Sequence, residues 1–343
     1  MSVALTRSRL SNALRCYFGY ALSRLGSVRF LHITHYTLHH SPLFVSVEPA
    51  NICQLKCPAC PVGRHDVTRS NKDAVPNSQT MSNAVWQRTL SEVAKTAWVI
   101  QFYFQGEPLL NKDLPVMIRE AHDAGLYTIV STNAQAMTPE LANALVAAGL
   151  DRIIVSMDGL SDASYNAYRI GGSLEKTKAA LRYLRDAKQS QTKTKSQTFK
   201  QHQTIVELQC LRLKSNEHEW SELKRVYKSL GADKLTLKTA QLYDYANGHP
   251  LMPSNSKYSR YILGTDGLYH RRPLRKGCFR VWSGCVITTT GEVLPCCYDK
   301  AHTFSYGNIM TAPLKYLFCS PQAQAFRKAA YQQTPPICQE CYK

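Results

Sequence analysis

The sequence predicts an α/β fold with a parallel sheet, followed by a small cysteine-rich C-terminal region. Between about residues 43 and 242, short β-branched or aromatic runs alternate with segments of helical period. This alternation is typical of parallel sheets covered by helices. The sheet is expected either to lie open between two helical layers or to curve into a partial barrel. In both cases ligands bind beyond the carboxyl ends of the strands.

Composition narrows the class of protein further. The 343 residues are 44% hydrophobic, which is too apolar for a disordered chain. Lys and Arg number 42 against 24 Asp and Glu, so the formal net charge is +18. This charge favours anionic substrates, nucleic acid or an acidic membrane surface as partners. No apolar run reaches the 18 residues that a membrane span needs, and arginines interrupt any signal-peptide core, so we expect a cytoplasmic protein.

The first segment, residues 1–42, is basic and aromatic. Leu10, Leu14, Phe18 and Leu22 recur at a spacing near i+4 between arginines, which predicts an amphipathic helix. We expect this helix to pack on the outside of the next domain. Peripheral contact with a membrane is the alternative.

The second segment, residues 43–242, contains the alternating elements. The expected strands are Leu43–Val47, Val99–Phe104, Tyr127–Ser131, Arg152–Ser156, Ile205–Leu211 and Lys234–Lys238. The expected helices are Asn83–Thr96, Leu114–Ala124, Thr138–Ala148, Leu174–Ala187 and Glu217–Leu230. A polar stretch, Gln189–Gln203, predicts a mobile loop between a helix and a strand.

Three cysteines follow the first strand closely, at Cys53, Cys57 and Cys60. A structural zinc site requires four protein ligands. A four-iron cluster held by three cysteines keeps one iron open for a small molecule, so this cluster is the preferred interpretation. A zinc site completed by His65 and a redox pair at Cys57 and Cys60 are the alternatives.

The third segment, residues 243–343, carries a second cysteine group. Thr290–Gly291 predicts a hairpin turn that brings Cys278 and Cys296 together. The pair Cys338 and Cys341 then completes a four-thiolate site, for which iron–sulfur and zinc are both chemically suitable. Cys297 is the rival of Cys296 as a ligand. The remaining cysteines are interpreted as ordinary thiols: Cys16, Cys210, Cys285 and Cys319.

Taken with three further motifs, the first cysteine group resembles the CxxxCxxC signature of the radical S-adenosylmethionine (SAM) superfamily. The motifs follow successive strands as Gln105–Pro108, Ser131–Asn133 and Ser156–Gly159. The resemblance implies a partial (β/α)6 TIM-like barrel with a [4Fe-4S] cluster on Cys53, Cys57 and Cys60. It also implies cofactor-binding residues: Glu107 for the SAM ammonium, Ser131 and Asn133 for its ribose and carboxylate, Ser156 and Asp158 for cofactor or substrate, and Arg169 for its carboxylate.

The second cysteine group resembles the SPASM/Twitch auxiliary-cluster domains that follow such cores. Gly291 and Cys296 match their GxxxxC element. The resemblance implies an auxiliary [4Fe-4S] cluster on Cys278, Cys296, Cys338 and Cys341. The single CxxC is similar to the shorter Twitch form.

Together these resemblances imply an enzyme that reductively cleaves SAM to a 5′-deoxyadenosyl radical, which removes a hydrogen atom from the substrate. Dehydrogenation or oxidative modification of a small molecule or peptide is expected, with flavodoxin or ferredoxin as external one-electron donor. Alternatives are a radical epimerase with Cys297 as hydrogen donor and an RNA-modifying iron–sulfur enzyme. Nucleic acid is the less favoured partner, because no RNA-binding pattern occurs. Candidate substrate-pocket residues are Tyr103, Gln209, Lys238, Tyr243, Tyr258 and Arg260.

Overall fold

A computed structural model describes residues 4–24, 39–64, 80–194, 203–272, 277–339 and 341. Its strands are β1 (Phe44–Val47), β2 (Val99–Phe102), β3 (Tyr127–Thr132), β4 (Arg152–Ser156), β5 (Ile205–Arg212), β6 (Lys234–Thr239), β7 (Tyr261–Leu263), β8 (Tyr269–Arg271), β9 (Gly284–Ile287) and β10 (Val293–Leu294). Its α-helices are α1 (Arg7–Ser23), α3 (Asn83–Val93), α4 (Leu114–Asp123), α5 (Pro139–Ala147), α6 (Asp162–Asn166), α7 (Leu174–Thr194), α8 (Trp220–Val226), α9 (Arg280–Ser283), α10 (Leu314–Phe318), α11 (Pro321–Gln332) and α12 (Pro336–Gln339).

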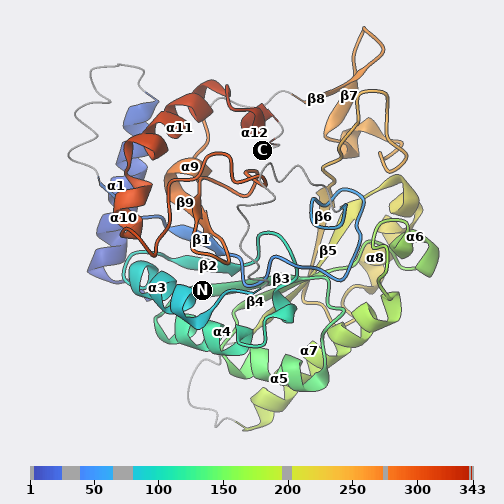
Figure 1. The fold of residues 1–343 in the computed structure, drawn as a ribbon. Helices are drawn as coiled ribbons and strands as arrows, with labels where there is room; N and C mark the ends of the chain where they lie inside the picture. The colour runs from blue at the N-terminus through green and yellow to red at the C-terminus, as the bar shows by residue number, and fades with distance from the viewer. Residues whose placement is uncertain are drawn as a thin grey trace.

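Eight of the strands form one curved sheet in the order β10-β9-β1-β2-β3-β4-β5-β6. Strands β1 to β6 run parallel, as predicted, and their register follows chain order. Helices α3, α4, α5, α7 and α8 lie along the outer face of this sheet (Figure 1). The sheet is an incomplete barrel whose inner face we call the lumen. Parallel strands place all their carboxyl ends at one rim of the lumen.

Local sequence explains where several helices begin. The Ser82 hydroxyl accepts a hydrogen bond from Val85 N at the start of α3. Thr138 caps α5 in the same way, and Pro139 occupies its first turn, where a missing N–H costs nothing. The predicted helix at Glu217–Leu230 begins as a 3₁₀ turn, Lys214–Glu219, and only then continues as α8. Helix α7 extends to Thr194, so the first residues of the predicted loop Gln189–Gln203 are helical. Residues 195–202 of that loop lie outside the described residues.

The C-terminal region is joined to the barrel more closely than the sequence predicts. Strand β9 pairs in parallel with β1, with Val45 opposite Cys285, and β10 returns antiparallel as the predicted hairpin. Val281, Ile309 and Phe318 belong to the same buried cluster as the barrel residue Ile100. The strand–helix alternation does stop at β6. The C-terminal region therefore shares the apolar core of the barrel.

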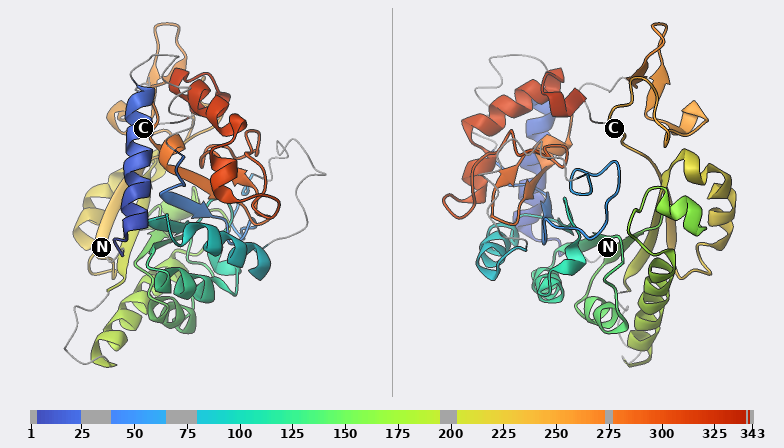
Figure 2. Two further views of the ribbon diagram at one scale, coloured as in Figure 1. Left: turned by 90° about the vertical axis from the view of Figure 1, so that its left-hand side faces the viewer. Right: turned by 45° about the vertical axis from the view of Figure 1, so that its right-hand side comes forward.

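Helix α1 packs on the outside of the barrel, as expected, but through a different face. Arg9, Asn12, Cys16 and Gly19 are its buried residues. The predicted apolar stripe points outward: Leu10, Leu14 and Phe18 are 45%, 57% and 54% exposed. Figure 2 shows α1 lying against the C-terminal part of the chain. No helix of the described segments is long and apolar enough to cross a lipid bilayer.

The unexpected face of α1 has a physical cause in Arg9. Its guanidinium donates hydrogen bonds to the carbonyls of Ala94, Ala124 and Gly125 at 2.8 Å each. These carbonyls stand at the carboxyl ends of α3 and α4, where helical C=O groups lack intrahelical partners and attract cations. Gly19 allows a second close contact, because a Cβ there would lie 3.3 Å from the Trp282 ring. Polar capping therefore determines which face of α1 is buried.

Candidate functional site

The loop that follows β1 carries Cys53, Cys57 and Cys60 at the rim of the lumen, where the sequence predicted it. The loop is tightly folded on itself: a Cβ at Gly63 would lie 2.5 Å from Cys57 N. It is also anchored to the end of β2. Glu107 N donates to Ile52 O at 2.7 Å, and Gly106 adopts a φ of +68° so close to the loop that a Cβ would meet Ala50 O at 2.3 Å. Only glycine fits this position.

Two of the three sulfur atoms receive N–H groups from the end of β3, from the loop itself and from Arg169. Asn133 Nδ2 lies 3.3 Å and Leu55 N 3.4 Å from Cys53 Sγ, and Arg169 Nη1 lies 3.9 Å from Cys57 Sγ. Burial raises the pKa of Cys57 to about 11; Arg169 opposes this rise, and the thiolates of Cys60 and Cys53 add to it. Burial and the neighbouring sulfur atoms thus disfavour the thiolate form of Cys57 unless a cation is bound.

This arrangement fits an iron–sulfur cluster. All three cysteines are free thiols. Within the described ranges, no three His, Cys, Asp or Glu side chains converge closely enough to hold one metal ion. A single zinc ion requires sulfur atoms at about 2.3 Å, whereas a multi-iron cluster spans more widely spaced thiolates. His65, the proposed fourth zinc ligand, lies outside the described residues.

Glu107 connects the ends of β2 and β3. Its buried carboxylate accepts hydrogen bonds from Leu109 N at 3.1 Å, from Thr132 Oγ1 at 2.5 Å and from Asn133 N at 2.8 Å. Burial raises the pKa of Glu107, and these three hydrogen bonds oppose the rise. A carboxylate has about four acceptor sites, so it retains capacity for the SAM ammonium. Glu107 therefore also positions Asn133 beside Cys53, a role that the sequence did not reveal.

Asp158 and Arg169 form a second buried unit. Arg169 Nε donates to Asp158 Oδ2 at 2.6 Å, and Leu211 N donates to Asp158 Oδ1 at 2.6 Å. Burial opposes the charge of Arg169, but Asp158 and Cys57 together raise its pKa. Asp158 is fully buried and contacts the site through Arg169, in place of the direct contact with cofactor or substrate that its sequence motif predicts.

The remaining predicted cofactor residues, Ser131 and Ser156, lie on the lumen side of β3 and β4. Their strand neighbours Val130 and Val155 pack into the core on the helix side. Because strand side chains alternate between faces, both serines face the lumen. The structure thus brings every predicted cofactor residue to one rim.

The cysteines of the second group lie near one another, although, within the part of the chain that the structure describes, no three of them converge closely enough to hold one metal ion. Burial raises the pKa of Cys296 to about 12, and Cys297, Cys278 and Cys338 add to the rise. Burial also raises the pKa of Cys338 to about 11, and Cys278 and Cys341 add to this rise. Arg271 Nη1 holds the pair by donating to Cys341 O at 3.2 Å.

Cys297 points elsewhere. Arg280 Nη1 donates to its sulfur at 3.0 Å, and both groups influence the pKa of Tyr103 at the end of β2. Cys297 therefore lies beside Arg280 and in the neighbourhood of Tyr103. The other cysteines contact carbonyl groups or core residues: Cys16, Cys210, Cys285 and Cys319.

Comparison with known proteins agrees with this site. Residues 47–199 match the Radical SAM superfamily, and residues 278–342 match the iron–sulfur cluster-binding domain SPASM. The chain is 29% identical over 279 residues to a PqqA peptide cyclase of Bradyrhizobium diazoefficiens, covering 74% of this chain and 66% of that relative. It is 24% identical over 313 residues to an AdoMet-dependent heme synthase of Methanosarcina barkeri, covering 84% and 85%. The chain thus spans just under two thirds of the length of the Bradyrhizobium relative.

The fold has solved counterparts. The crystal structure of Streptococcus suis SuiB superimposes with a TM-score of 0.61 at 13% identity, covering 87% of this chain and 70% of that one. The two matched domains imply the same cofactors as the site: a [4Fe-4S] cluster with S-adenosylmethionine in the barrel, and auxiliary iron–sulfur binding in the C-terminal region. The chain is a radical SAM superfamily enzyme with a SPASM-type iron–sulfur domain.

Proposed function

We propose that this enzyme oxidatively modifies a peptide or small molecule held in the barrel lumen. The observation that carries the proposal is the position of the two cysteine groups. Cys53, Cys57 and Cys60 stand at the rim, and the Cys278, Cys296, Cys338 and Cys341 group belongs to the segment that continues the same sheet through β9. A substrate in the lumen therefore lies between a site that starts radical chemistry and a site that accepts an electron.

The residues of the rim hold and orient the cofactors. Cys53, Cys57 and Cys60 ligate the barrel cluster, while Asn133 and Arg169 direct N–H groups at two of these sulfurs. When bound, the cluster and S-adenosylmethionine supply a 5′-deoxyadenosyl radical that removes a hydrogen atom from the substrate. Ser131 and Ser156 face the lumen, where the ribose and carboxylate of the cofactor are expected.

The C-terminal cysteines leave no open coordination position if all four bind one cluster, so an electron-transfer role suits them. The first electron is expected from an external carrier such as flavodoxin or ferredoxin. The formal charge of +18 favours association with an acidic carrier. Similarity to a PqqA peptide cyclase favours a peptide among the candidate substrates.

Epimerisation is the second candidate, and Cys297 favours it. Its thiol lies beside Arg280 rather than joining the other cysteines. A thiol there could return a hydrogen atom to a substrate radical, and the thiyl radical left on Cys297 would be restored by one electron from the external carrier and a proton from solvent. The substrate itself would then be neither oxidised nor reduced.

The test is reductive cleavage of S-adenosylmethionine by anaerobically reconstituted protein. We expect 5′-deoxyadenosine and methionine with dithionite, measured by mass spectrometry, and none from a C53A/C57A/C60A variant. Loaded wild-type protein that forms no 5′-deoxyadenosine would contradict the proposal. Once a substrate is found, solvent deuterium at the reacting carbon of the product would favour epimerisation, and its absence would favour oxidation.

We further propose that α1 contacts an anionic membrane surface. Its outward face combines Leu10, Leu14, Tyr17 and Phe18 with exposed Arg7 and Arg15, and the chain has no Asp or Glu before Glu48. Basic helices with an apolar face bind at the interface of anionic bilayers. This charge complementarity is the reason for choosing a lipid surface rather than another protein.

Vesicle sedimentation tests this contact. We expect binding to phosphatidylglycerol vesicles that falls with salt, little binding to phosphatidylcholine vesicles, and loss of binding in an L14S/F18S variant, whose changes lie at exposed positions. Equal sedimentation of this variant with phosphatidylglycerol vesicles would exclude α1 as the contact.

A further inference from the structure

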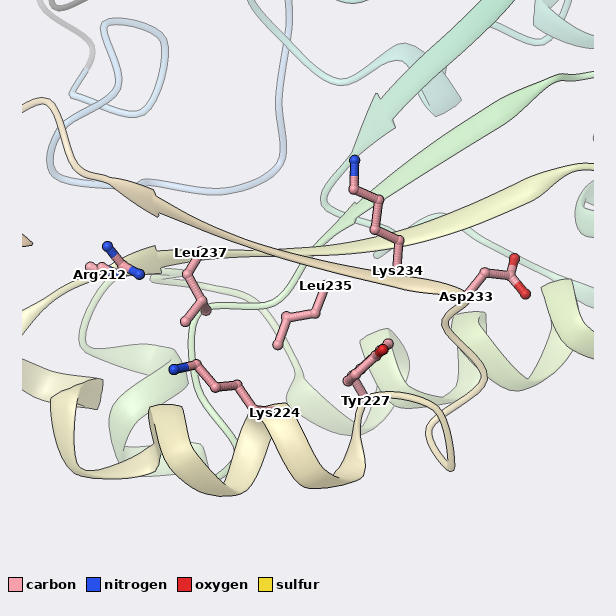
Figure 3. Close-up of a pocket in the computed structure, with 7 residues that line it drawn as sticks. All are labelled: Arg212, Lys224, Tyr227, Asp233, Lys234, Leu235 and Leu237. Carbon is pink, nitrogen blue, oxygen red and sulfur yellow. The ribbon is translucent and has the colours of Figure 1, made fainter. Parts of the chain in front are cut away.

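The lumen of the barrel collects basic side chains that the cofactor site does not use. On β6, Leu235 and Leu237 pack towards the helix side, into a pocket beside α8 that is lined by Arg212, Lys224, Tyr227, Asp233, Lys234, Leu235 and Leu237. Figure 3 shows Lys234 directed to the opposite side of the strand. Because side chains alternate along a strand, Lys238 faces the lumen together with Lys234. On β4, Ile153 packs on the helix side, so Arg152 also faces the lumen.

Lys238 and three arginines from three other segments lie in one neighbourhood. Its pKa is lowered, first by burial and then by the charges of Arg152, Arg280 and Arg260. Two of these arginines are held in place by hydrogen bonds to side chains that are not carboxylates. Arg260 donates to Thr239 Oγ1 at 3.2 Å and to Tyr298 Oη at 3.1 Å, and Arg280 donates to Cys297 Sγ at 3.0 Å.

One carboxylate close to these cations is shared between two of them. Glu207 pairs with Arg152 and also lies 3.9 Å from Lys234, so one carboxylate serves two cations. The Lys238 ammonium has no hydrogen bond or ion pair with any residue that the structure describes. Arg152 Nε is buried and lacks a partner in the same part of the chain. Arg152, Arg280 and Arg260 each lower the pKa of Lys238, so the cations repel one another, and an anion bound among them would reduce this repulsion.

We propose that this cluster, Lys238 with Arg260 and Arg280, binds an anionic group of the substrate, a carboxylate or a phosphate. The inference rests on the proposed function, because it assumes that the substrate enters the lumen. Guanidinium groups bind both anions in a bidentate manner, and the Lys238 ammonium adds a point charge. The Tyr298 hydroxyl lies beside Arg260, and the phenol of Tyr103 shares the neighbourhood of Arg280 and Cys297. An anion held here would fix the remainder of the substrate between the two cysteine groups.

Thermal unfolding of the reconstituted holoprotein at constant ionic strength tests this site. The probes are inorganic phosphate and malonate, with chloride as reference. We expect phosphate, malonate or both to raise the Tm of the wild type by about 2 °C. The anion that gives the larger rise identifies the preferred chemistry. The rise should vanish in K238M and return in K238R, which restores the charge.

The matched control is K228M, since Lys228 is an exposed lysine that follows α8 on the helix side. We expect this variant to show the wild-type rise. Circular dichroism at low temperature verifies that K238M is folded before its Tm is interpreted. A wild type that responds to neither anion, or a folded K238M that responds as strongly as wild type, would overturn the inference.

Cleavage of S-adenosylmethionine by the wild type is measured in the same preparations. A protein that binds anions through Lys238 but forms no 5′-deoxyadenosine would contradict the proposed function and leave the anion site standing. A protein that cleaves S-adenosylmethionine without an anion response would do the reverse. The two proposals therefore fail separately.

Discussion

Arg169 forms a buried ion pair at the rim. Its guanidinium contacts the fully buried carboxylate of Asp158 and also faces the Cys57 sulfur. Removing one partner of a buried ion pair leaves an uncompensated charge. We expect R169M to lower the free energy of unfolding by about 3–5 kcal/mol. Anaerobic urea denaturation of the reconstituted protein measures the change.

The double variant D158N/R169M separates the charge effect from lost packing. We expect it to be more stable than R169M, since an amide oxygen still accepts from Leu211 N and no charge is left buried. A double variant that is less stable than R169M would show that Asp158 is stabilised by groups other than Arg169.

The choice between Cys296 and Cys297 is a second question at this scale. Cys278 and Cys338 both raise the pKa of Cys296, whereas the Cys297 sulfur accepts a hydrogen bond from Arg280. We expect C296A to lower the iron-to-protein ratio and C297A to keep the wild-type ratio. Iron analysis after anaerobic reconstitution, with Tm as the check on folding, decides it. Equal iron loss in both variants would return Cys297 to the set of ligands.

The residues at the rim could be predicted from the sequence because each follows a strand in chain order. Cys53, Glu107 and Asn133 stand after β1, β2 and β3, and parallel strands bring such positions together. The sequence does not distinguish Cys296 from Cys297 as a ligand. The two residues are adjacent, so they share the same local pattern and differ only in the direction of their side chains. The cluster of basic residues in the lumen could not be predicted from the sequence either. Arg152 and Arg280 are far apart in the chain and come together only in the folded sheet.

Among the elements, α1 shows how a polar residue overrides an apolar pattern. The stripe of Leu10, Leu14 and Phe18 predicted the buried face, yet the four hydrogen bonds of the Arg9 guanidinium determine the observed one. Two of its acceptors are the carbonyls of Ala94 and Ala124 at helix ends. They lie far along the chain, so the sequence of residues 1–42 cannot predict these contacts. Strand bounds, which depend on local pattern, were predicted to within a few residues for β1 to β6, whereas α7 continues beyond its predicted end at Ala187 to Thr194.

Replacing Arg9 tests this explanation of α1. We expect R9M to destabilise the protein by about 3 kcal/mol, because it leaves several buried carbonyls without donors. The exposed Arg7 is the matched control, and R7M should change stability by less than about 0.5 kcal/mol. Urea denaturation measures both. Similar small effects for the two variants would show that Cys16 and Gly19 hold α1 without the guanidinium.

At the scale of the whole molecule, the C-terminal region and the barrel are one packed body. Strand β9 continues the sheet beside β1, and Phe318 shares a buried cluster with Ile100. The sequence predicted a separate module, because the strand–helix alternation stops after β6 and the local composition changes. Pairing between β1 and β9 joins residues about 240 positions apart, and no periodicity within either segment reports it.

This continuity decides what loss of the auxiliary ligands should do. A module that depends on a metal for folding unfolds when its ligands are removed. Here the C-terminal strands and helices retain the barrel core, so we expect the C338A/C341A variant to remain folded by circular dichroism and to keep the iron of the first cysteine group. It should then cleave S-adenosylmethionine at least in part while forming no oxidised product, because the electron left on the substrate has no acceptor.

The same variant separates oxidation from epimerisation. If C338A/C341A is folded, retains the first cluster and still converts substrate, the C-terminal cluster is structural and the substrate is neither oxidised nor reduced. Cys297, which lies beside Arg280, would then be the hydrogen donor, and C297A would be the variant that stops turnover. If instead C338A/C341A unfolds, the sheet pairing of β9 does not suffice to hold the C-terminal region, and the shared core is weaker than its burial indicates.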